Sequence, residues 1–372
     1  MKRIIYIGED TASYHLFFNG VSSSDTIPLF NLTDFNQAVL PAIDVEKINT
    51  AEHIIFSRDI DWKTLKIADL VIRHKIPYSY YADDNYFILN RIVPSKKVNR
   101  FLSNADAFIS TTSTMNNFFK SMGSQYDKKL IQLDLDVDIP KKPTPKKSLS
   151  KKILNIGFLG TGKNWLYPDV MQDLIDNLPN YKLNIYAPLP LCKLLRKNPI
   201  ADSVMLIEFS FIKNYLDFVE TIKEFNLDFI LQPADLEDQN YQFKNLNSLL
   251  LPYHCNCLTI FCDNAPYDSI KKQGLDELLA RDNKFSNAIT KIINDNDKRI
   301  ALTERLFSYV ENNFSANDNI GILQNSLCFK EYGEQALPRY LKELRFRKIE
   351  KIYHRLRRSF YRKFNASQQQ HL

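Results

Sequence analysis

Two short stretches of the sequence place lysine beside backbone features that bind phosphate. The first is Gly160-Thr161-Gly162-Lys163, which follows the apolar run Ile153–Leu159 and precedes a helical pattern. Glycine lets the backbone approach a ligand closely, and free amides at the start of a helix attract anions. The stretch matches neither of the glycine-rich phosphate-binding signatures, so an ordinary turn between a strand and a helix explains it equally well.

The second stretch is Lys244-Asn245, at the start of the helical pattern Leu246–Tyr253. The helix dipole disfavours lysine in a first turn unless an anion binds there, and a solvated loop lysine is the alternative. A third candidate is the loop Asp263-Asn264-Ala265-Pro266-Tyr267, which follows the strand-like run Leu258–Cys262. Ligand sites of α/β proteins gather at such strand ends, although asparagine and proline also form plain turns.

The first half of the chain supplies candidates for acid–base chemistry. Asp83 and Asp84 follow a β-prone run, and adjacent side chains of an extended backbone face opposite ways. We therefore expect one of them to face a ligand, where a carboxylate could orient or deprotonate a hydroxyl. His74 is a second candidate base, and Arg58 could pair with a phosphate or an acidic sugar. The alternatives are a capping acid, a structural histidine and a surface ion pair.

The elements that would position these residues alternate between strands and helices. Expected strands are Lys2–Gly8, Glu52–Ser57, Ile76–Ala82, Ala107–Ser110, Leu130–Leu135, Ile153–Leu159, Lys182–Ala187, Ser203–Ile207, Phe229–Gln232 and Leu258–Cys262. Expected helices are Trp62–His74, Thr114–Met122, Tyr167–Leu178, Ile212–Phe225, Leu246–Tyr253, Phe285–Ile293 and Asp297–Phe314. This alternation predicts an α/β fold with a doubly wound parallel sheet in each half.

Residues 140–152 separate the two halves. They contain three prolines, six lysines and no acidic residue, which is typical of a linker. We expect a Rossmann-like N-terminal domain at 1–139, the linker at 140–152, a second Rossmann-like domain at 153–330, and a basic helix and tail at 331–372. Two α/β domains joined in this way predict a cleft that faces the carboxyl ends of both sheets.

The basic charge of the chain is local. The net charge is +6, and segment 339–363 alone contains eleven basic and two acidic residues. Because the rest of the chain is acidic once this segment and the linker are set aside, nucleic acid is not an expected partner. Ile349, Ile352, Leu356, Phe360 and Phe364 recur at helical spacing, so we expect a basic amphipathic helix suited to an anionic membrane surface. Packing of this helix onto the N-terminal domain is the alternative.

Several classes of protein are not expected. No window approaches the ~18 apolar residues of a membrane-spanning helix, and the N-terminal apolar run is too short for a secretion leader. The five cysteines are typical of reduced thiols, and Cys255 and Cys257 lack the spacing and the second pair of a zinc site. We expect a cytoplasmic protein at the inner face of the cell membrane, without a metal or another cofactor.

The ordered motifs resemble those of two-domain GT-B glycosyltransferases, in the family-4 type branch that builds bacterial surface polysaccharides. The similar segments, across about residues 50–320, are Ile156–Thr161, Phe229–Pro233, Lys244-Asn245, Asp263–Tyr267, Tyr81–Asp84 and Ala105–Thr111. Carried over residue by residue, the resemblance implies donor contacts at Gly160, Thr161, Lys244 and the loop of Asp263, Asn264, Ala265 and Tyr267. The neighbouring residues Gly162, Lys163 and Asn245 complete the candidate donor site. In this arrangement we expect an acceptor side at Gly8, Asp10 and Arg58, with Asp83, Asp84 and His74 as catalytic candidates.

The resemblance implies transfer of a sugar from a nucleotide-sugar donor to a hydroxyl of a bacterial surface glycan. One departure concerns nucleotide recognition: where the family has a glutamate that holds the donor's ribose, this chain has Leu251. The family's second lysine is Ser248 here, and its small glycine is Asn256. Either Glu237 or Asp238 replaces the glutamate, or nucleotide recognition differs, or activity is lost. A catalytically silent binding or scaffolding partner with the same fold is therefore the alternative.

Overall fold

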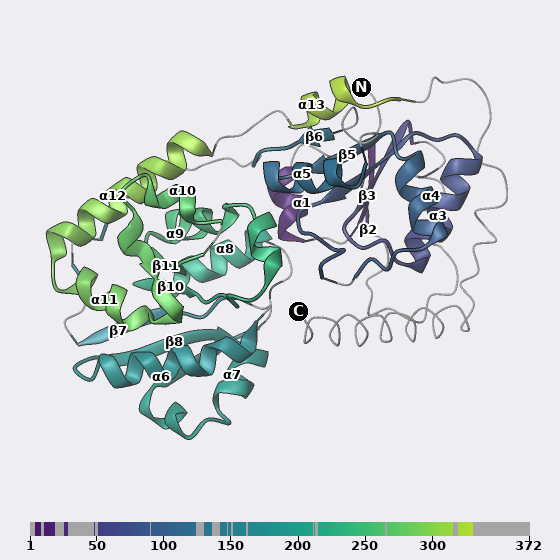
Figure 1. Cartoon of the computed structure of the whole chain (residues 1–372). Coiled ribbons are helices and arrows are strands. Elements are labelled where there is room, and N and C mark those ends of the chain that lie inside the picture. Colours follow the sequence, from purple (N-terminus) through teal and green to yellow (C-terminus); the bar gives the residue numbers. More distant parts are fainter. Residues whose placement is uncertain are drawn as a thin grey trace. The chain divides into compact units, whose positions relative to one another are not determined.

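The computed structural model divides the chain into two compact units, each built on one parallel sheet (Figure 1). The first unit comprises the described residues up to 135 together with 319–329, and the second comprises those from 142 to 314. The structure describes residues 4–8, 11–18, 26–28, 48, 51–89, 91–123, 130–135, 142–146, 148–149, 152–160, 163–210, 212, 215–264, 266–314 and 319–329. Asp10, Thr161, Gly162, Ala265 and the expected basic helix at 339–363 lie outside these residues.

The sheet of the first unit has six parallel strands in the order β2-β1-β3-β4-β5-β6. The strands are β1 (Ile4–Gly8), β2 (Thr26–Pro28), β3 (His53–Ser57), β4 (Tyr78–Ala82), β5 (Ala107–Ser110) and β6 (Leu130–Gln132). The helices are α1 (Ala12–Phe17), α3 (Trp62–Arg73), α4 (Lys96–Asn104), α5 (Ser113–Ser121) and α13 (Asn319–Ser326). Helices α3, α4 and α5 each begin at a side-chain cap, provided by Asp61, Ser95 and Thr112 respectively.

Alternation along β4 divides the aromatic core of this unit between the two faces of the sheet. Tyr80 packs edge-on against Phe101 of α4 and Phe119 of α5. Its neighbour Tyr81 points to the other face and packs edge-on against Phe18, which follows α1. Because successive side chains of a strand face opposite ways, one aromatic strand serves both layers. The predicted doubly wound arrangement is therefore confirmed for this unit.

Helix α13 belongs to the first unit, although residues up to 330 were expected in the second domain. The Asn319 side chain donates hydrogen bonds to the carbonyl oxygens of Phe17, at 3.0 Å, and Asp134, at 2.7 Å. The buried His53 ring binds the Cys328 carbonyl oxygen through Nδ1 at 2.6 Å and Ser79 Oγ through Nε2 at 2.8 Å. Because buried polar groups need partners, these contacts hold residues 319–329 on the first unit. The composition of the linker at 140–152 does not predict that the chain crosses back to the first unit.

The buried His53 ring predicts that acid destabilises the protein. Burial lowers the pKa of His53 to about 4 from its ordinary 6.5, and burial followed by the nearby Lys223 lowers that of His254 similarly. Between these values the unfolded chain binds a proton that the folded chain does not. The free energy of unfolding should therefore fall as the pH drops from 6.5 to 4, by up to about 1.4 kcal/mol per pH unit for His53. Urea unfolding at several pH values measures the slope.

The comparison for this pH prediction is His53→Gln, which removes the ionisable ring and keeps hydrogen-bonding capacity. We expect the variant to be less stable at pH 7 but to lose less stability between pH 6.5 and pH 4. Other carboxylates and histidines titrate equally in both proteins, so they cancel in the difference between the two slopes. Equal slopes would contradict the assignment of acid sensitivity to His53.

The sheet of the second unit has the order β12-β11-β10-β7-β8-β9, again all parallel. The strands are β7 (Ile153–Gly157), β8 (Lys182–Pro188), β9 (Met205–Phe209), β10 (Phe229–Gln232), β11 (Leu258–Cys262) and β12 (Leu279–Ala280). The helices are α6 (Tyr167–Asn177), α7 (Leu189–Leu195), α8 (Tyr215–Glu224), α9 (Leu250–Cys255), α10 (Asp268–Lys271), α11 (Phe285–Ile293) and α12 (Asn296–Asn313). The 3-10 helices are η3 (Asn164–Leu166), η4 (Pro199–Ser203), η5 (Gln239–Phe243), η6 (Asn247–Leu249), η7 (Asp276–Leu278) and η8 (Arg281–Asn283).

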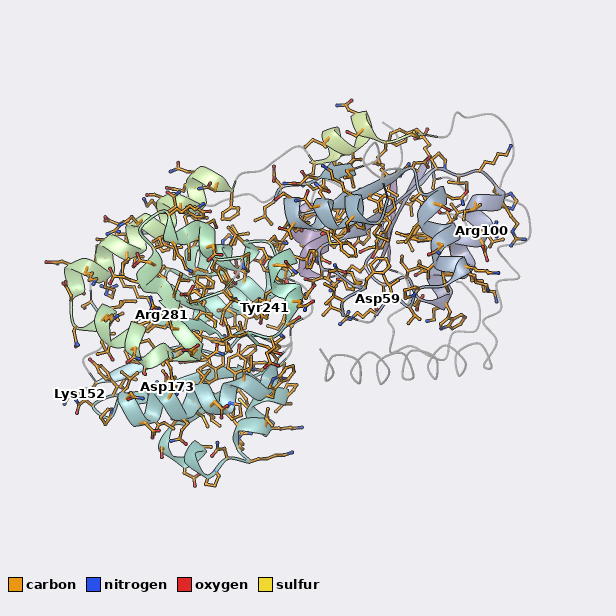
Figure 2. All side chains as sticks on the ribbon, viewed as in Figure 1. Asp59, Arg100, Lys152, Asp173, Tyr241 and Arg281 are labelled. Atoms are coloured by element: carbon orange, nitrogen blue, oxygen red, sulfur yellow. The ribbon has the colours of Figure 1, made fainter. Side chains whose placement is uncertain are left out.

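A buried carboxylate joins two helices of this unit that are distant in sequence. Asp173 of α6, labelled in Figure 2, accepts hydrogen bonds from the backbone amide of Ser286 at 2.9 Å and from its hydroxyl at 3.0 Å. Ser286 lies in the first turn of α11, where backbone amides lack partners within the helix. Asp173 thus caps α11 from another element and fixes it against α6.

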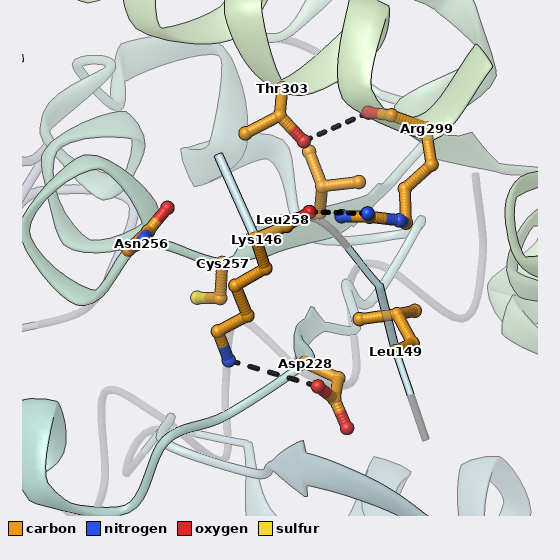
Figure 3. A pocket seen from close by; sticks show the side chains of 8 residues that line it. All are labelled: Lys146, Leu149, Asp228, Asn256, Cys257, Leu258, Arg299 and Thr303. Atoms are coloured by element: carbon orange, nitrogen blue, oxygen red, sulfur yellow. Dashed lines mark hydrogen bonds and ion pairs between the residues drawn. The ribbon is translucent and has the colours of Figure 1, made fainter. Parts of the chain in front are cut away.

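Part of the expected linker is docked on the second unit. Lys146 Nζ donates to the carbonyl oxygen of Leu227 at 2.6 Å and lies 3.7 Å from Asp228 Oδ1 (Figure 3). The buried Arg299 guanidinium donates to the Lys146 carbonyl oxygen, and Asn256 Nδ2 donates to the Thr144 carbonyl oxygen at 2.9 Å. Lys146 and Thr144 of the expected linker therefore serve packing rather than spacing. Asp228 has a pKa raised by burial, against the opposing hydrogen bond from Asn155 and the charge of Lys146.

None of the helices in the described part of the chain is long and apolar enough to span a bilayer.

Candidate functional site

Each sheet has one topological switch point, where successive connections leave in opposite directions. In the first unit this point lies between β1 and β3, and in the second it lies between β7 and β10. Ligands of open α/β sheets bind outside the carboxyl ends of the strands at such points. The residues at these two strand ends are therefore the candidate sites, and we describe each within its own unit.

At the switch point of the second unit, Lys163 joins the loop after β7 to the loop after β10. Its Nζ lies 2.6 Å from Asp238 Oδ2 and 3.5 Å from Asp235 Oδ2. It also lies 4.6 Å from the centre of the Tyr241 ring, labelled in Figure 2. A lysine so placed is already neutralised by the protein's own carboxylates. An anionic ligand at Lys163 would have to displace Asp238.

The backbone amide of Gly160 also has a partner. It donates a hydrogen bond to the Tyr167 hydroxyl at 3.0 Å, and burial raises the pKa of that hydroxyl although the Gly160 bond opposes the rise. A Cβ atom at Gly160 would lie 2.6 Å from the same hydroxyl oxygen. Glycine is therefore needed here for close packing against Tyr167. A phosphate that used the Gly160 amide would compete with Tyr167.

Lys244 and Asn245 lie on the same edge of the sheet, between η5 and η6. Lys244 ends η5 with a backbone hydrogen bond to Tyr241 O at 3.1 Å, and its side chain is half-buried. Asn245 Oδ1 accepts from the backbone amide of Asn247 at 3.0 Å, at the start of the helical segment that continues into α9. Lys244 thus stands just before a helical N-terminus, as the sequence pattern predicts, but the segment begins as a 3-10 turn.

The loop after β11 is tied into the unit by buried hydrogen bonds. The Tyr267 hydroxyl lies 2.9 Å from Ser248 Oγ and 3.3 Å from Gln232 Oε1, and burial raises the pKa of Tyr267 to about 12 although the Ser248 hydrogen bond lowers it. Asp263 pairs with Lys271, with 2.6 Å between Oδ1 and Nζ. Tyr267 therefore joins the loop after β11 to η6 and to the end of β10, and Asp263 joins that loop to α10. A buried Asn264 Oδ1 has no hydrogen-bond partner among the residues that the structure describes.

The position of the family's ribose-binding glutamate lies in the core. Leu251 is 7% exposed and packs in an apolar cluster with Leu159, Val219, Ile222, Leu227, Ile230, Cys255 and Cys257. A side chain there is enclosed by apolar neighbours. Asn256, at the family's glycine position, ends α9 with φ of 49°, a left-handed conformation that asparagine tolerates better than most residues. Glycine adopts this left-handed conformation without strain, which explains why the family has glycine at the position.

The two acids proposed as substitutes for that glutamate differ in their surroundings. Glu237 is exposed. Asp238 accepts from the backbone amide of Asn240 at 2.9 Å through Oδ1 and pairs with Lys163 through Oδ2. Glu237 is therefore the more accessible of the two acids, and Asp238 stabilises the loop after β10.

The switch point of the first unit contains a buried cluster around Asp83. Asp83 Oδ1 accepts from the Tyr86 hydroxyl at 2.7 Å and lies 3.6 Å from Arg58 Nε, and Oδ2 accepts from the Ser13 hydroxyl. Asp83 is 7% exposed. Donors thus occupy both of its oxygens, and an acceptor hydroxyl would have to displace one of them before Asp83 could act as a base. Asp84 is also buried, at 8% exposure.

The other predicted residues of this unit separate into two places. Gly8 ends β1, where an added Cβ would lie 2.6 Å from Ser57 Cβ, so glycine permits the close approach of β1 and β3. Arg58 follows β3 beside it. His74 instead ends α3 and lies just before β4, at the amino edge of the sheet. Because β4 runs the full depth of the sheet between them, His74 does not join Asp83 in one site.

Sequence reasoning missed the tyrosines that organise both sites. Tyr86 holds Asp83 and Arg58, Tyr167 caps the Gly160 amide, and Tyr241 covers Lys163. Only Tyr86, three residues after Asp83, stood close enough in sequence to be a signal. In the part of the chain that the structure describes, no group of three or more His, Cys, Asp or Glu side chains is arranged to hold a metal ion.

No protein-family model matches the chain, and neither does any curated protein. Among solved structures, a mutant of S. aureus TarM, crystallised with fondaparinux, α-GlcNAc-glycerol and UDP, superposes with a TM-score of 0.52 at 14% identity over 77% of this chain. The chain has a GT-B glycosyltransferase-like fold. It spans 58% of that TarM chain. The lipopolysaccharide outer core galactosyltransferase WaaB matches with a TM-score of 0.48 at 15% identity, over 88% of this chain and 99% of that chain.

Each sheet has candidate residues near the ends of the strands that flank its switch point. Gly8 and Arg58 lie at the first, and Gly160, Lys163 and Lys244 lie at the second. The shared fold explains why motifs about 80 residues apart in sequence meet at one sheet edge: parallel neighbouring strands end on the same side.

Proposed function

We propose that this protein is a glycosyltransferase that moves a sugar from a nucleotide-sugar donor to a hydroxyl of a bacterial surface glycan, of the capsule, O-antigen or lipooligosaccharide type. The supporting observation is the contact of Lys163, which follows β7, with Asp238 and Tyr241 of the loop after β10, in a GT-B-like fold. Lys244 lies three residues after Tyr241, at the end of η5. The TarM structure contains UDP, which is consistent with a nucleotide donor for this chain.

In this proposal the donor diphosphate displaces Asp238 from Lys163. Lys163 and Lys244 then neutralise the leaving group, together with amides at Gly160 and at the start of the helical segment after Asn245. Lysines in this role would replace a divalent metal, so we propose metal-independent transfer. Asp263, Asn264 and Tyr267 shape the loop that closes the sugar end of the site.

One observation favours a second function, that of a catalytically silent binding partner with the same fold. Leu251 is buried in the core, Lys163 is paired with two carboxylates, and the Gly160 amide is bonded to Tyr167. In the described residues, each of these three donor-site features is thus used by the protein itself. A protein that no longer binds a donor could retain a sheet edge whose polar groups are paired with one another.

Nucleotide binding separates the two functions. Thermal unfolding of the full chain would be followed with UDP, GDP, ADP and CMP and with their sugar conjugates, with and without EDTA. A ligand at one hundred times its dissociation constant stabilises the folded state by about 2.7 kcal/mol, which is measurable. Stabilisation by one nucleotide and its sugar conjugate, unaffected by EDTA, supports transfer when it is followed by release of that nucleotide in the presence of an acceptor. Failure of every nucleotide to stabilise the protein supports the silent partner.

We further propose peripheral attachment to the membrane through 339–363. Basic residues beside an anionic surface contribute about 1 kcal/mol each, so a few of the eleven would suffice for reversible binding. In flotation with liposomes, binding should rise with anionic lipid, fall with salt and disappear on truncation after Pro338. Equal recovery with neutral and anionic liposomes, or with the truncated chain, would contradict this attachment.

A further inference from the structure

The guanidinium of Arg58 is anchored at one end only. Its Nε donates to the Tyr86 hydroxyl and makes the closest approach to Asp83, at 3.6 Å from Oδ1. Within the described residues, its two terminal nitrogens have no hydrogen-bond partner, and the side chain is 22% exposed. Arginine carries five N–H donors in a planar fork, and an arginine with a purely structural role commonly presents that fork to a carboxylate. In Arg58 the two terminal nitrogens are therefore available to a ligand.

The surroundings of Arg58 fix its direction. Its backbone amide donates to Tyr81 O at 2.8 Å, and its carbonyl oxygen accepts from the Tyr80 hydroxyl at 2.7 Å. Its φ of 67° lies in the left-handed region, which an arginine occupies at some cost in strain. The guanidinium carbon lies 5.5 Å from the centre of the Tyr86 ring. A side chain held in this way loses little conformational freedom when it binds a ligand.

The fork lies at the switch point of the first sheet. Arg58 follows β3, beside the end of β1 at Gly8, where the absence of a Cβ atom lets β1 and β3 pack closely. A second arginine, Arg91, contacts the same tyrosine: its guanidinium lies 5.7 Å from the centre of the Tyr86 ring, and its Nη1 lies 4.0 Å from Asp59 Oδ1. Arg91 therefore adds a positive charge beside the same tyrosine as Arg58. Unlike Arg58, it already uses one terminal nitrogen for a contact with a carboxylate of the protein, Asp59.

The charges around the fork select the kind of anion. Burial would lower the pKa of Arg58, but Asp83, followed by Tyr86, Tyr6 and Asp84, raises it well above its ordinary value, so the guanidinium stays charged. Asp83 and Asp84 also place negative charge nearby. An anion with a single charge shared between two oxygens fits this setting better than a doubly charged phosphate, because like charges repel.

We propose that Arg58 binds a singly charged acidic group of the acceptor, a phosphodiester or a sugar carboxylate, through its two terminal nitrogens. This inference rests on the proposed function, since it names the acceptor class of that site. Both groups offer two equivalent oxygens at a spacing that matches the guanidinium fork. The acceptor hydroxyl would then approach Asp83 and Asp84 on the neighbouring strand end.

The test measures binding alone, without donor or transfer. Full-length protein labelled with 15N-arginine would be titrated with bis(glycerol) phosphate, with methyl glucuronide and with the neutral methyl glucoside, and the Arg58 Nε–H signal would be followed by NMR. We expect at least one anionic probe to shift this signal and the neutral sugar to leave it unchanged; the two anionic arms distinguish phosphodiester from carboxylate. A signal that responds equally to the neutral sugar, or to none of the probes, would overturn the proposal.

Two variants separate the fork from charge in general. Arg58→Lys keeps a cation beside Asp83 but loses the two-point contact, so affinity should fall at least tenfold. Arg91→Gln removes an equal charge from the same cluster and should change affinity less than twofold. Equal losses in both would overturn a specific fork. If Arg58→Lys fails to fold, Arg58→Gln with Asp83→Asn removes both buried charges together and should abolish the anion-dependent response in signals from the remaining arginines.

The outcome is independent of the donor site. An anion that binds at Arg58 in a protein without nucleotide affinity would support the inference and contradict the proposed transfer. Transfer to a neutral acceptor, with no response at Arg58 to either anion, would support the transfer and contradict the inference.

Discussion

Replacing Lys244 with alanine should lower sugar transfer by a hundredfold or more and weaken nucleoside-diphosphate binding, without unfolding the protein. The side chain is half-buried at the carboxyl edge of the second sheet, just before the helical segment that begins at Asn247. Loss of one group that stabilises negative charge in the transition state typically costs about 2.7–4 kcal/mol, which is a hundredfold to a thousandfold in rate. The measurement is the rate of nucleoside-diphosphate release with an authentic donor and acceptor, together with nucleotide affinity by calorimetry.

The matched control for Lys244 is Lys291→Ala. Lys291 is an exposed residue of α11 in the same unit, so its removal changes the net charge equally without touching the switch point. Thermal unfolding of both variants would show that neither loses its fold. Transfer that is unchanged in Lys244→Ala, or reduced equally by Lys291→Ala, would remove Lys244 from the donor site.

Restoring the family's acid with Leu251→Glu should destabilise the second unit by about 3–5 kcal/mol and give no gain in nucleotide affinity. Leu251 is 7% exposed within an apolar cluster, where an ionised carboxylate has neither solvent nor a partner. Because burial disfavours the charged form, the loss should be smaller at pH 5 than at pH 7. Urea unfolding at both pH values measures the effect, and nucleotide affinity is measured in parallel.

Two further variants calibrate the Leu251 result. Leu251→Met conserves volume and apolarity and should cost less than about 1.5 kcal/mol. Leu251→Gln has nearly the shape of the glutamate without its charge, so the difference between them isolates the charge. A stable Leu251→Glu protein that binds nucleotide more tightly than the natural chain would show that position 251 reaches the donor after all, and would refute its place in the core.

The sequence was informative wherever a pattern is local. Strand ends at Gly8, Ser57 and Ala82 were predictable because apolar β-prone runs stop at glycine or at polar residues. Parallel pairing was predictable from alternation with helices, and pairing of this kind brings strand ends together without further information. The sequence alone therefore predicts one sheet edge for the candidate residues Gly160, Lys163 and Lys244.

Partners of side chains were not predictable, because they come from elements distant in sequence. Lys163 was expected to bind a phosphate. The fold instead places Asp238, 75 residues later in the sequence, with its Oδ2 2.6 Å from Lys163 Nζ. Lys146 was expected in a free linker, but the carbonyl oxygens before β10 accept its hydrogen bonds. His74 had the right chemistry for a base, but a helix that returns along the sheet places its last residue at the opposite edge.

The sequence by itself determined the two α/β halves and most of their strands, because local apolar patterning and chain connectivity set these features. The short edge strands β2 (Thr26–Pro28) and β12 (Leu279–Ala280) were not expected, because two or three residues carry too little pattern. Only the tertiary structure decided which of those residues are already satisfied by the protein. Asp83 is held by Tyr86 and Ser13, and Leu251 faces the core, while the fork of Arg58 has no hydrogen-bond partner in the described part of the chain. The physical reason is that a polar group buried on folding must find a partner in three dimensions, and sequence spacing does not specify which one.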